Sequence, residues 1–276
     1  MLTSIIFSKN RACQLDLLLR SIRQNLPNFR DTFVLYHATT PEFEQGYELV
    51  RQRFPEFDTI IHQQSNFEFD TRDFISRAGE YVCFFVDDNI IYRPHDIDHQ
   101  FVDRMFNCIP ELTCFTLRLG TNTVVQDQYH NQPTVFPENI MVGNVVGTMI
   151  YLWDWTTVKV FGDFSYPFSV DGHIYKVKDL LPLLDYEFDT PNAFEGRFDK
   201  NTFSTNLMCC FKQSVLVNNP LNIVGSSNNN AGLYWGHTVE ELNKKYLDGY
   251  QISLNSIMER DVFAAHQEME IEFEKV

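Results

Sequence analysis

The chain has 276 residues, of which 44% are hydrophobic, and this length and composition suit one large globular domain with a sizeable core. It carries 37 acidic against 22 basic residues, a formal net charge of −15, which disfavours binding to nucleic acid and to anionic membrane surfaces. No uninterrupted apolar run approaches the ~18 residues of a transmembrane helix, so we expect neither a membrane-spanning segment nor a signal peptide.

The six cysteines indicate a reducing compartment. None belongs to a CxxC pair, and several lie inside apolar runs such as YVCFFV and LMCCF, where a free cysteine behaves as a small hydrophobic residue. We therefore expect a cytoplasmic protein.

The first ninety residues alternate between strand and helix patterns. Strands are predicted at 1–8, 32–38, 58–64 and 81–86, and helices at 14–26, 41–53 and 70–77, the last of them capped by Asp70. Strands separated by helices in this way are typical of βαβ units, in which a parallel sheet is covered on both faces.

The pattern loosens after Pro94. The sequence predicts strands at 112–119 and 213–219, a long apolar strand at 141–155 and an edge strand in the tail 266–276. Helices are predicted at 96–108 and 178–184, with a helix start at 192–198 and a capped helix from Thr238 to Gly249. Residues 121–138 are predicted to form a loop, and residues 162–175 an aromatic loop. The economical interpretation is one domain over residues 1–276, regular at first and elaborated later.

Two carboxylates and an amide close the most apolar of these strands, YVCFFV. Asp87, Asp88 and Asn89 then lie at the carboxyl end of a strand, where open parallel sheets bind their ligands. Carboxylate and amide oxygens are hard ligands of the kind that Mg²⁺ and Mn²⁺ accept. The alternative is an ordinary polar turn at the end of a strand.

A cation-rich loop follows the first strand. Ser8, Lys9 and Arg11 stand at the same edge of the predicted sheet as the carboxylates, just before a helix N-terminus, which favours anions. Each cation alone suits an ordinary solvated loop. The conjunction of a basic loop and a metal-ready acid pair predicts a site for a nucleotide diphosphate.

These segments resemble one family. Residues 4–22, SIIFSKNRACQLDLLLRSI, resemble the opening strand, loop and helix of GT-A-fold glycosyltransferases, and residues 84–90, FFVDDNI, resemble their acidic DxD-type motif at the end of a central strand. Further on, FTLRLG, YPFSVDGHIY and TPNAFE resemble segments of bacterial and viral glycosyltransferase-like proteins of the same group. The resemblance implies an α/β, GT-A-like and Rossmann-like fold, with a mostly parallel central sheet flanked by helices.

The resemblance also implies a function. It implies an enzyme that moves a sugar from a UDP-, GDP- or dTDP-linked donor to a carbohydrate or glycoconjugate acceptor, assisted by Mn²⁺ or Mg²⁺. Residues 1–92 would then form the nucleotide-binding half and residues 93–276 the acceptor-binding half.

The family roles carry over residue by residue. By resemblance, Ser8, Lys9 and Arg11 would contact the nucleotide. Asp87 and Asp88 would contact the ribose and the metal, as would Asn89. This chain departs from a strict DxD, because Asn89 stands where the second Asp would be if Asp87 is the first.

Glycosyl transfer needs stabilisation of the leaving diphosphate and, in an inverting enzyme, a group that takes the proton of the acceptor hydroxyl. The predicted catalytic carboxylates are Asp171, in the aromatic-rich SVDGHIY, and Glu195, in TPNAFEGR. His173 is a further candidate ligand of the metal or the phosphate. The structural alternatives are an Asp-Gly turn, a first-turn acid that complements a helix dipole, and a packed histidine.

Five aromatic residues are candidates to stack on sugar rings: Trp153, Trp155, Tyr166, Phe168 and Trp235. Most aromatic side chains belong to a core, so for each of them the core is the favoured interpretation. Tyr166 and Phe168, on either side of Pro167, are the least core-like.

Other functions compete with this one. Sugar-phosphate nucleotidyltransferases resemble GT-A proteins in fold, but their chains open with a glycine-rich loop. The corresponding SKNRACQ has no glycine, which argues against this class. A second alternative is a catalytically silent binding protein of the same fold. Asn89, which stands in place of an acid, leaves this alternative open. A glycoside hydrolase needs two carboxylates placed across the scissile bond, about 5–10 Å apart, which the spacing of residues in a sequence does not reveal.

Overall fold

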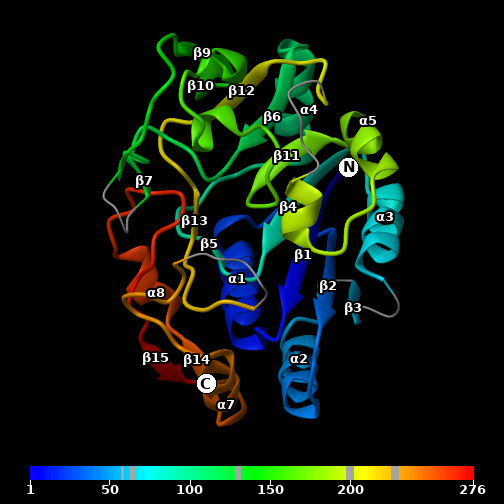
Figure 1. Ribbon diagram of the computed structural model, residues 1–276, viewed down its shortest axis with the longest axis vertical. Coiled ribbons are helices and arrows are strands. Elements are labelled where there is room, and N and C mark those ends of the chain that lie inside the picture. The colour runs from blue at the N-terminus through cyan, green and yellow to red at the C-terminus, as the bar shows by residue number, and fades with distance from the viewer. Residues whose placement is uncertain (57–58, 63–65, 128–131, 197–201, 225–229) are drawn as a thin grey trace.

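The computed structural model describes residues 1–56, 59–62, 66–127, 132–196, 202–224 and 230–276. In this part of the chain a nine-stranded sheet runs through the molecule in the order β3-β2-β1-β4-β11-β6-β12-β10-β9 (Figure 1). Its strands are β1 (Leu2–Lys9), β2 (Thr32–His37), β3 (Thr59–His62), β4 (Tyr81–Val86), β6 (Leu112–Thr116), β9 (Met141–Val145), β10 (Thr148–Asp154), β11 (His173–Lys176) and β12 (Leu207–Phe211).

The sheet is mostly parallel. The first four strands in the order above pair in parallel, and so do β6 and β12. Within this sheet, β11 runs antiparallel to β4 and β6, and β10 runs antiparallel to β12 and β9. Because β11 is antiparallel to β4, the residues that precede β11 lie at the same edge as the residues that follow β4.

The remaining elements surround this sheet. Its helices are α1 (Ala12–Asn25), α2 (Pro41–Arg53), α3 (Phe67–Arg77), α4 (His99–Cys108), α5 (Val177–Leu180), α6 (Pro191–Glu195), α7 (Val239–Leu247) and α8 (Leu254–Met258). Short strands pair in twos: β5 (Asn89–Ile91) with β13 (Leu216–Asn218), β7 (Val125–Asp127) with β8 (Gln132–Pro133), and β14 (Tyr250–Ile252) with β15 (Phe273–Lys275). No helix among the described residues is long and apolar enough to cross a membrane.

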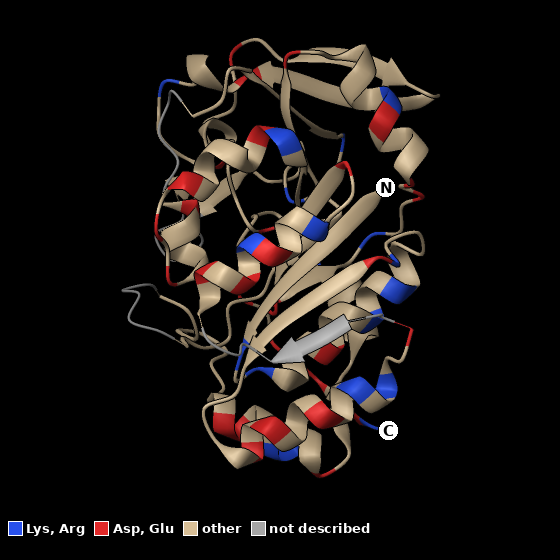
Figure 2. Ribbon diagram, turned by 90° about the vertical axis from the view of Figure 1, so that its right-hand side faces the viewer, with Lys and Arg blue, Asp and Glu red and all other residues tan. Residues whose placement is uncertain are grey.

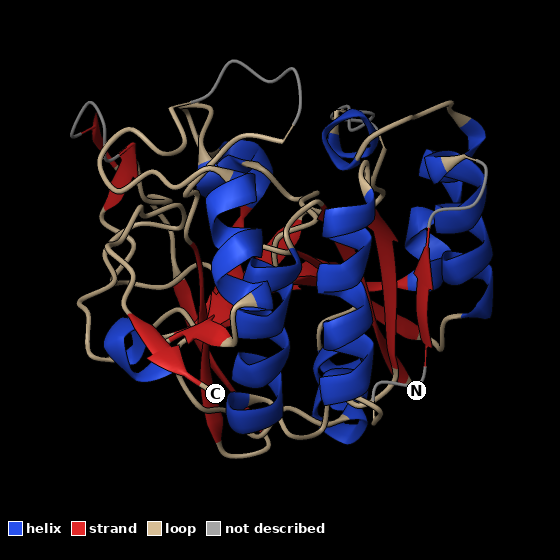
Figure 3. Cartoon of the chain, turned by 90° about the horizontal axis from the view of Figure 1, so that it is seen from below, coloured by secondary structure: helices blue, strands red, loops and turns tan. Residues whose placement is uncertain are grey.

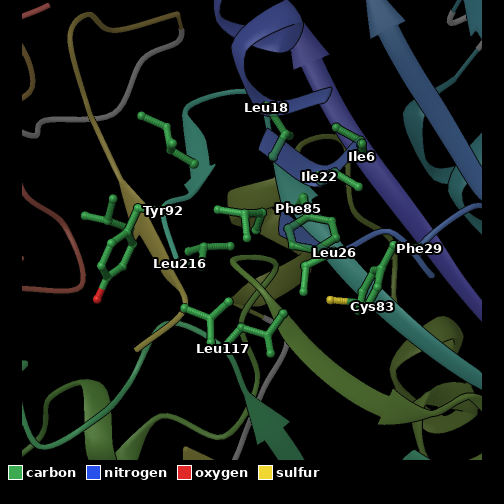
Figure 4. Packing of buried hydrophobic residues seen from close by; sticks show 14 of the residues in the cluster. Ile6, Leu18, Ile22, Leu26, Phe29, Cys83, Phe85, Tyr92, Leu117 and Leu216 are labelled. Atoms are coloured by element: carbon green, nitrogen blue, oxygen red, sulfur yellow. The ribbon is translucent and has the colours of Figure 1, made fainter. Parts of the chain in front are cut away.

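The sheet separates two hydrophobic cores. Successive residues of β4 point to opposite sides, so that Cys83 and Phe85 pack into one core and Val82 and Phe84 into the other. Figure 4 shows the first core, in which Phe85 lies with side chains of α1 such as Leu18. The second core contains side chains of α3 and α6. Helices therefore cover both faces, as predicted, and the view from below shows strands between helices (Figure 3).

Charged residues are distributed unevenly between the sheet and the elements that cover it. Acidic and basic residues lie mainly on helices and loops, and the strands are largely uncharged (Figure 2). This distribution is expected of a sheet that is buried on both faces.

The regular first half matches its predicted elements closely. The strands and helices of residues 1–56 appear within a few residues of their expected bounds, and Thr238 and Glu241 form the predicted capping box of α7. One cap is different: α3 begins at Phe67, because the side chain of Asn66 accepts hydrogen bonds from the backbone N–H groups of Glu68 and Phe69, and Asp70 lies inside the helix. Parts of the segments predicted at 58–64 and 192–198 lie outside the described residues.

The second half departs further from its predictions. The long strand expected at 141–155 is a hairpin of β9 and β10, which turns at Val146 and Gly147, both with positive φ. The expected aromatic loop at 162–175 contains β11, a strand of the central sheet. The tail pairs through the three residues of β15 and through a single bridge between His266 and Asn218, and most of the residues between them are buried.

A buried ion network joins the two ends of the chain. Asp16 of α1 is fully buried, and its oxygens lie 2.7 Å from the guanidinium nitrogens of Arg20 and Arg53. The hydroxyl of Tyr246, on α7, donates a hydrogen bond of 2.9 Å to the same carboxylate. A buried carboxylate is tolerated when all of these partners are present, and removal of one member leaves uncompensated charge.

We predict that Asp16→Ala lowers the free energy of unfolding by about 3–5 kcal/mol, because Arg20 and Arg53 then lose their shared counterion. Urea denaturation followed by circular dichroism measures the change. The matched control is Asp73→Ala, which removes an exposed ion pair with Arg77 and is expected to cost less than about 1 kcal/mol. Equal losses in the two variants would contradict the structural role of Asp16.

Candidate functional site

A cavity of about 780 Å³ opens at the edge of the sheet where β1, β2 and β4 end. Its wall includes the loop after β1, the turn after β4, the residues just before β11, the start of α6 and the segment after β13. His266 adds a side chain from far along the chain. The position is the one expected for ligands of an open parallel sheet.

Arg11 is the central cation of the cavity wall. Its Nη1 lies 2.9 Å from Oδ1 of Asp87 and 3.2 Å from Oδ2 of Asp88, and its Nε donates a hydrogen bond of 2.6 Å to Oδ1 of Asn222. The Nη2 donates to the carbonyl oxygen of Asn222. The predicted basic loop and the predicted acid pair are therefore in direct contact.

The loop after β1 is shaped by Asn10. This residue has φ +57°, a left-handed conformation that asparagine tolerates better than most residues, and its side chain exchanges two hydrogen bonds with Thr39. The turn directs the backbone N–H of Lys9 to Oδ2 of Asp87 at 3.0 Å. Tyr47 fixes the loop from the other side, because its hydroxyl contacts Oγ of Ser8 at 2.7 Å and accepts from the N–H of Arg11.

Asp87 and Asp88 differ in their surroundings. Both oxygens of Asp87 accept hydrogen bonds, one from Arg11 and one from the N–H of Lys9. For Asp88, burial raises the pKa to about 6, because the cost of desolvating the charge and the repulsion from neighbouring carboxylates exceed the attraction of Arg11. The acid pair thus holds one carboxylate that gains or loses its proton close to neutral pH.

Asp171 meets these residues because β11 is antiparallel to β4. Its Oδ1 accepts from Nδ2 of Asn89 at 3.0 Å and from Nδ2 of Asn218 at 3.1 Å, and its Oδ2 lies 3.2 Å from Nη1 of Arg118. Burial opposes the charge, but the contacts with His266, Arg118 and Asn89 outweigh burial and hold the pKa of Asp171 well below its usual range. Asp171 is therefore a carboxylate that stays ionised.

Asn89 and His173 lie behind the cavity wall. Asn89 is fully buried, donates to Asp171 and accepts at Oδ1 from the N–H of Val86, so it ties the turn after β4 to the residue before β11. His173 is fully buried beside Tyr175, and burial lowers its pKa to about 3. Neither side chain lines the cavity. The two predicted ligands that do line it are Asp87 and Asp88.

Glu195 lies on the cavity wall at the end of α6. Its Oε1 accepts a hydrogen bond of 2.7 Å from the N–H of Val170. Burial and the nearby charge of Asp171 raise the pKa of Glu195. The structure thus brings both predicted catalytic carboxylates to one cavity and gives them pKa shifts of opposite sign.

Four site residues escaped the sequence analysis: Arg118, Asn218, Asn222 and His266. Two of them carried a local signal. Arg118 is a cation inside the apolar FTLRLG, which requires a buried counterion, and Asn218 ends an apolar strand as Asp87 does. No local pattern singles out His266, because its segment alternates apolar and acidic residues and is predicted to form an edge strand.

The five candidate stacking aromatics divide by exposure. Trp153, Trp155 and Phe168 are buried and belong to the second core, so the core interpretation is confirmed for them. Phe168 was one of the two thought least core-like, and that expectation was wrong. Tyr166 is partly buried, whereas Trp235 is 45% exposed and is not a core residue.

The cavity carries an excess of negative charge. Among the described residues, five carboxylates line it against two cationic side chains, those of Lys9 and Arg11. A wall of this kind attracts a cation and repels a phosphate unless a cation comes with it. No three His, Cys, Asp or Glu side chains in the described chain are placed to hold an ion alone, so an ion here needs further ligands from water or phosphate.

Comparisons with known proteins agree with the resemblance seen in the sequence. No family model matches the chain. A curated relative, the bifunctional glycosyltransferase pgtA of Dictyostelium discoideum, is 26% identical over 192 residues, which are 66% of this chain and 24% of pgtA. The chain thus spans about a quarter of the length of this relative, and the predicted resemblance to glycosyltransferases is confirmed.

Two solved structures are also similar. The crystal structure of S. aureus TarS matches 78% of this chain and 36% of its own at 14% identity and a TM-score of 0.48. TarS 1–349 in complex with UDP-GlcNAc matches 86% of this chain and 62% of its own at 10% identity and a TM-score of 0.44.

The raised pKa of Asp88 gives a testable dependence of stability on pH. Its pKa is about 6 in the folded chain against an ordinary 3.8, so the folded state binds the proton more tightly and stability falls as the pH rises through this window. We predict that Asp88→Asn removes this decline, leaves stability unchanged near pH 4 and raises it by about 3 kcal/mol above pH 7, at ~1.4 kcal/mol per pKa unit.

Urea denaturation at several pH values measures this effect, with Asp73→Asn as the control that shows no such change. A destabilised Asp88→Asn variant at pH 7.5 would mean that the ion pair with Arg11 outweighs the cost of burial.

Proposed function

We propose that the chain is a glycosyltransferase that moves a sugar from a nucleotide-diphosphate sugar to a carbohydrate or glycoconjugate acceptor. The observation that carries the proposal is the contact of Arg11 with Asp87 and Asp88 on the wall of a large cavity at the carboxyl edge of the sheet. It joins the two segments that resemble the glycosyltransferase family, and the similarity to pgtA supports the same activity.

The donor end of the cavity is assigned to the loop after β1, within residues 1–92. The side chain of Lys9 is exposed, lines the cavity and forms no ion pair with any described residue, so it is available to a phosphate. Arg11 is already engaged by three side chains, and we assign to it the placement of the acid pair and of the nucleotide beside it. Ser8, held by Tyr47, forms the adjoining wall.

A divalent ion fits the chemistry of this wall. Asp87 and Asp88 present carboxylate oxygens to the cavity, and the surplus of negative charge favours a cation that accompanies a diphosphate. These two residues would hold Mn²⁺ or Mg²⁺, and the ion would offset the charge that develops on the leaving diphosphate. Asn89 does not reach the cavity, so its presence in place of an acid does not argue for a silent protein.

The acceptor end is assigned to residues 93–276, which contribute Asp171 and Glu195. Both lie on the cavity wall, and their opposite pKa shifts suit one ionised and one protonatable carboxylate at working pH. A sugar hydroxyl bound here would lie beside both carboxylates, in the same cavity as the donor.

Nucleotide binding tests the proposal. We predict that at least one of UDP, GDP and dTDP, or a sugar conjugate of one of them, binds to the wild-type chain in the presence of Mn²⁺ and raises its melting temperature. Lys9→Ala should weaken binding about 10–100-fold, the value of one charge-assisted hydrogen bond of ~1.5–3 kcal/mol. Asp88→Ala should lower the rate of sugar transfer by about 10²–10³-fold.

Isothermal titration calorimetry measures binding, and release of the nucleoside diphosphate measures turnover. Asp73→Ala, which alters a carboxylate outside the cavity, is the matched control and should behave as wild type. The proposal fails if no nucleotide in the panel binds with Mn²⁺ present, or if Asp88→Ala retains full activity.

A further inference from the structure

We infer that His266 takes the proton of the acceptor hydroxyl and that Asp171 is its positioning residue. The inference rests on the proposed function and assigns a role in the reaction to a residue from the far end of the described chain. Three observations carry it: the way the backbone holds His266, the contact between the two side chains, and the engagement of both oxygens of Asp171.

The backbone on both sides of His266 is fixed to β13. The N–H of Asn218 donates to the carbonyl oxygen of Ala265, and the N–H of Gln267 donates to the carbonyl oxygen of Asn218, each at 2.9 Å. Two residues further on, the N–H of Met269 donates to Oδ1 of Asn219 at 2.8 Å. These hydrogen bonds fix the backbone of an otherwise irregular segment, and they hold His266 on the cavity wall.

The imidazole is accessible and has a carboxylate partner. The side chain of His266 is 45% exposed, and its Nε2 lies 3.5 Å from Oδ2 of Asp171, which is only 10% exposed. When Nε2 carries the hydrogen and faces Asp171, the neutral ring has its lone pair on Nδ1. A base of this kind, oriented by a buried carboxylate, recurs in enzymes that remove a proton from a hydroxyl group.

Asp171 itself is poorly suited to accept the proton. Its oxygens already accept hydrogen bonds from Asn89, Asn218 and Arg118, in addition to the contact with His266. A carboxylate with these partners is a weak base, because protonation would break favourable contacts. Its effect on the reaction is exerted through the ring that it orients.

The charges around His266 favour its protonated form. Desolvation works against the charged ring, but the contact with Asp171 outweighs it and raises the pKa of His266 above its ordinary value, while Arg118 acts in the opposite direction. Asp163, which pairs with Arg118, and Asp88 across the cavity also favour the charged form. These contacts therefore stabilise the imidazolium that forms when the ring takes a proton.

The proposed step balances. The acceptor oxygen forms a bond to the anomeric carbon of the donor sugar while the bond from that carbon to the diphosphate oxygen breaks, and the electron pair leaves with the diphosphate. The O–H bond of the acceptor breaks and its proton passes to Nδ1 of His266, which later releases it to solvent. The products are the glycosylated acceptor, the nucleoside diphosphate and one proton.

The test uses the full chain, the nucleotide sugar that binds in calorimetry, and water or simple methyl glycosides as acceptors. His266→Ala and His266→Gln are expected to keep wild-type affinity for the nucleoside diphosphate within twofold and to release it about 10²–10⁴-fold more slowly. The fall in rate that wild type shows toward acid pH should disappear in both variants. Added imidazole should raise the rate of His266→Ala at least tenfold.

Two variants complete the test. Asp171→Asn should slow release and change the acid limb of the pH profile. His95→Ala alters a half-buried histidine that lies outside the cavity and stacks on Phe211, and its rate and pH profile should be those of wild type. The inference is overturned by full activity of His266→Ala, by loss of nucleotide binding in both His266 variants, or by the absence of rescue by imidazole. If wild type binds no nucleotide at all, the proposed function fails instead.

Discussion

The site depends on one buried guanidinium. Arg11 compensates two adjacent carboxylates that would otherwise repel each other, and an unpaired charge in this position would cost several kcal/mol. Its remaining nitrogens reach Asn222, so a single side chain joins the loop after β1, the turn after β4 and the segment after β13. The left-handed turn at Asn10 and the hydroxyl of Tyr47 serve this contact, because they fix the backbone from which Arg11 projects.

A second constraint is the insertion of β11 between β4 and β6. A parallel strand in this position would deliver its preceding residues to the far edge of the sheet. The antiparallel strand instead brings Asp171 beside Asn89, and the amide of Asn218 donates hydrogen bonds to both Asp171 and Asp88. This shared amide donor helps two carboxylates with opposite pKa shifts to coexist in one cavity.

The first half of the fold and the part of the cavity wall after β1 and β4 were predictable because their signals are local. Apolar strands alternate with amphipathic helices such as α1 and α2, and the βαβ rule then places the end of β1 and the end of β4 at one edge. The contact between Arg11 and the acid pair follows from that placement. Asn89 and His173, both predicted as metal ligands, lie behind the cavity wall, because the sequence pattern does not reveal the direction of a side chain at the start of a short strand.

The second half was harder because its pairings are not local. The run LMCCF of β12 shows no alternation, since both of its faces are buried, and the apolar run at 141–155 conceals a turn at Val146, a residue type that seldom adopts positive φ. Backbone hydrogen bonds to β13 hold His266 at the cavity. A pattern of side-chain polarity carries no information about such bonds.

The bond between Arg11 and Asn222 closes a loop over 211 positions of the chain. Contacts of this separation form late in folding, after much of the entropy of the intervening chain has been lost. While a ribosome is still making residues 93–221, the emerging chain holds Asp87 and Asp88 with only part of their final surroundings. At that stage Arg11 and the backbone N–H of Lys9 already accompany the acid pair, whereas Asn218 and Asn222 are still to be added. The electrostatic surroundings of this regular part of the sequence are therefore complete only once the segment after β13 has been made.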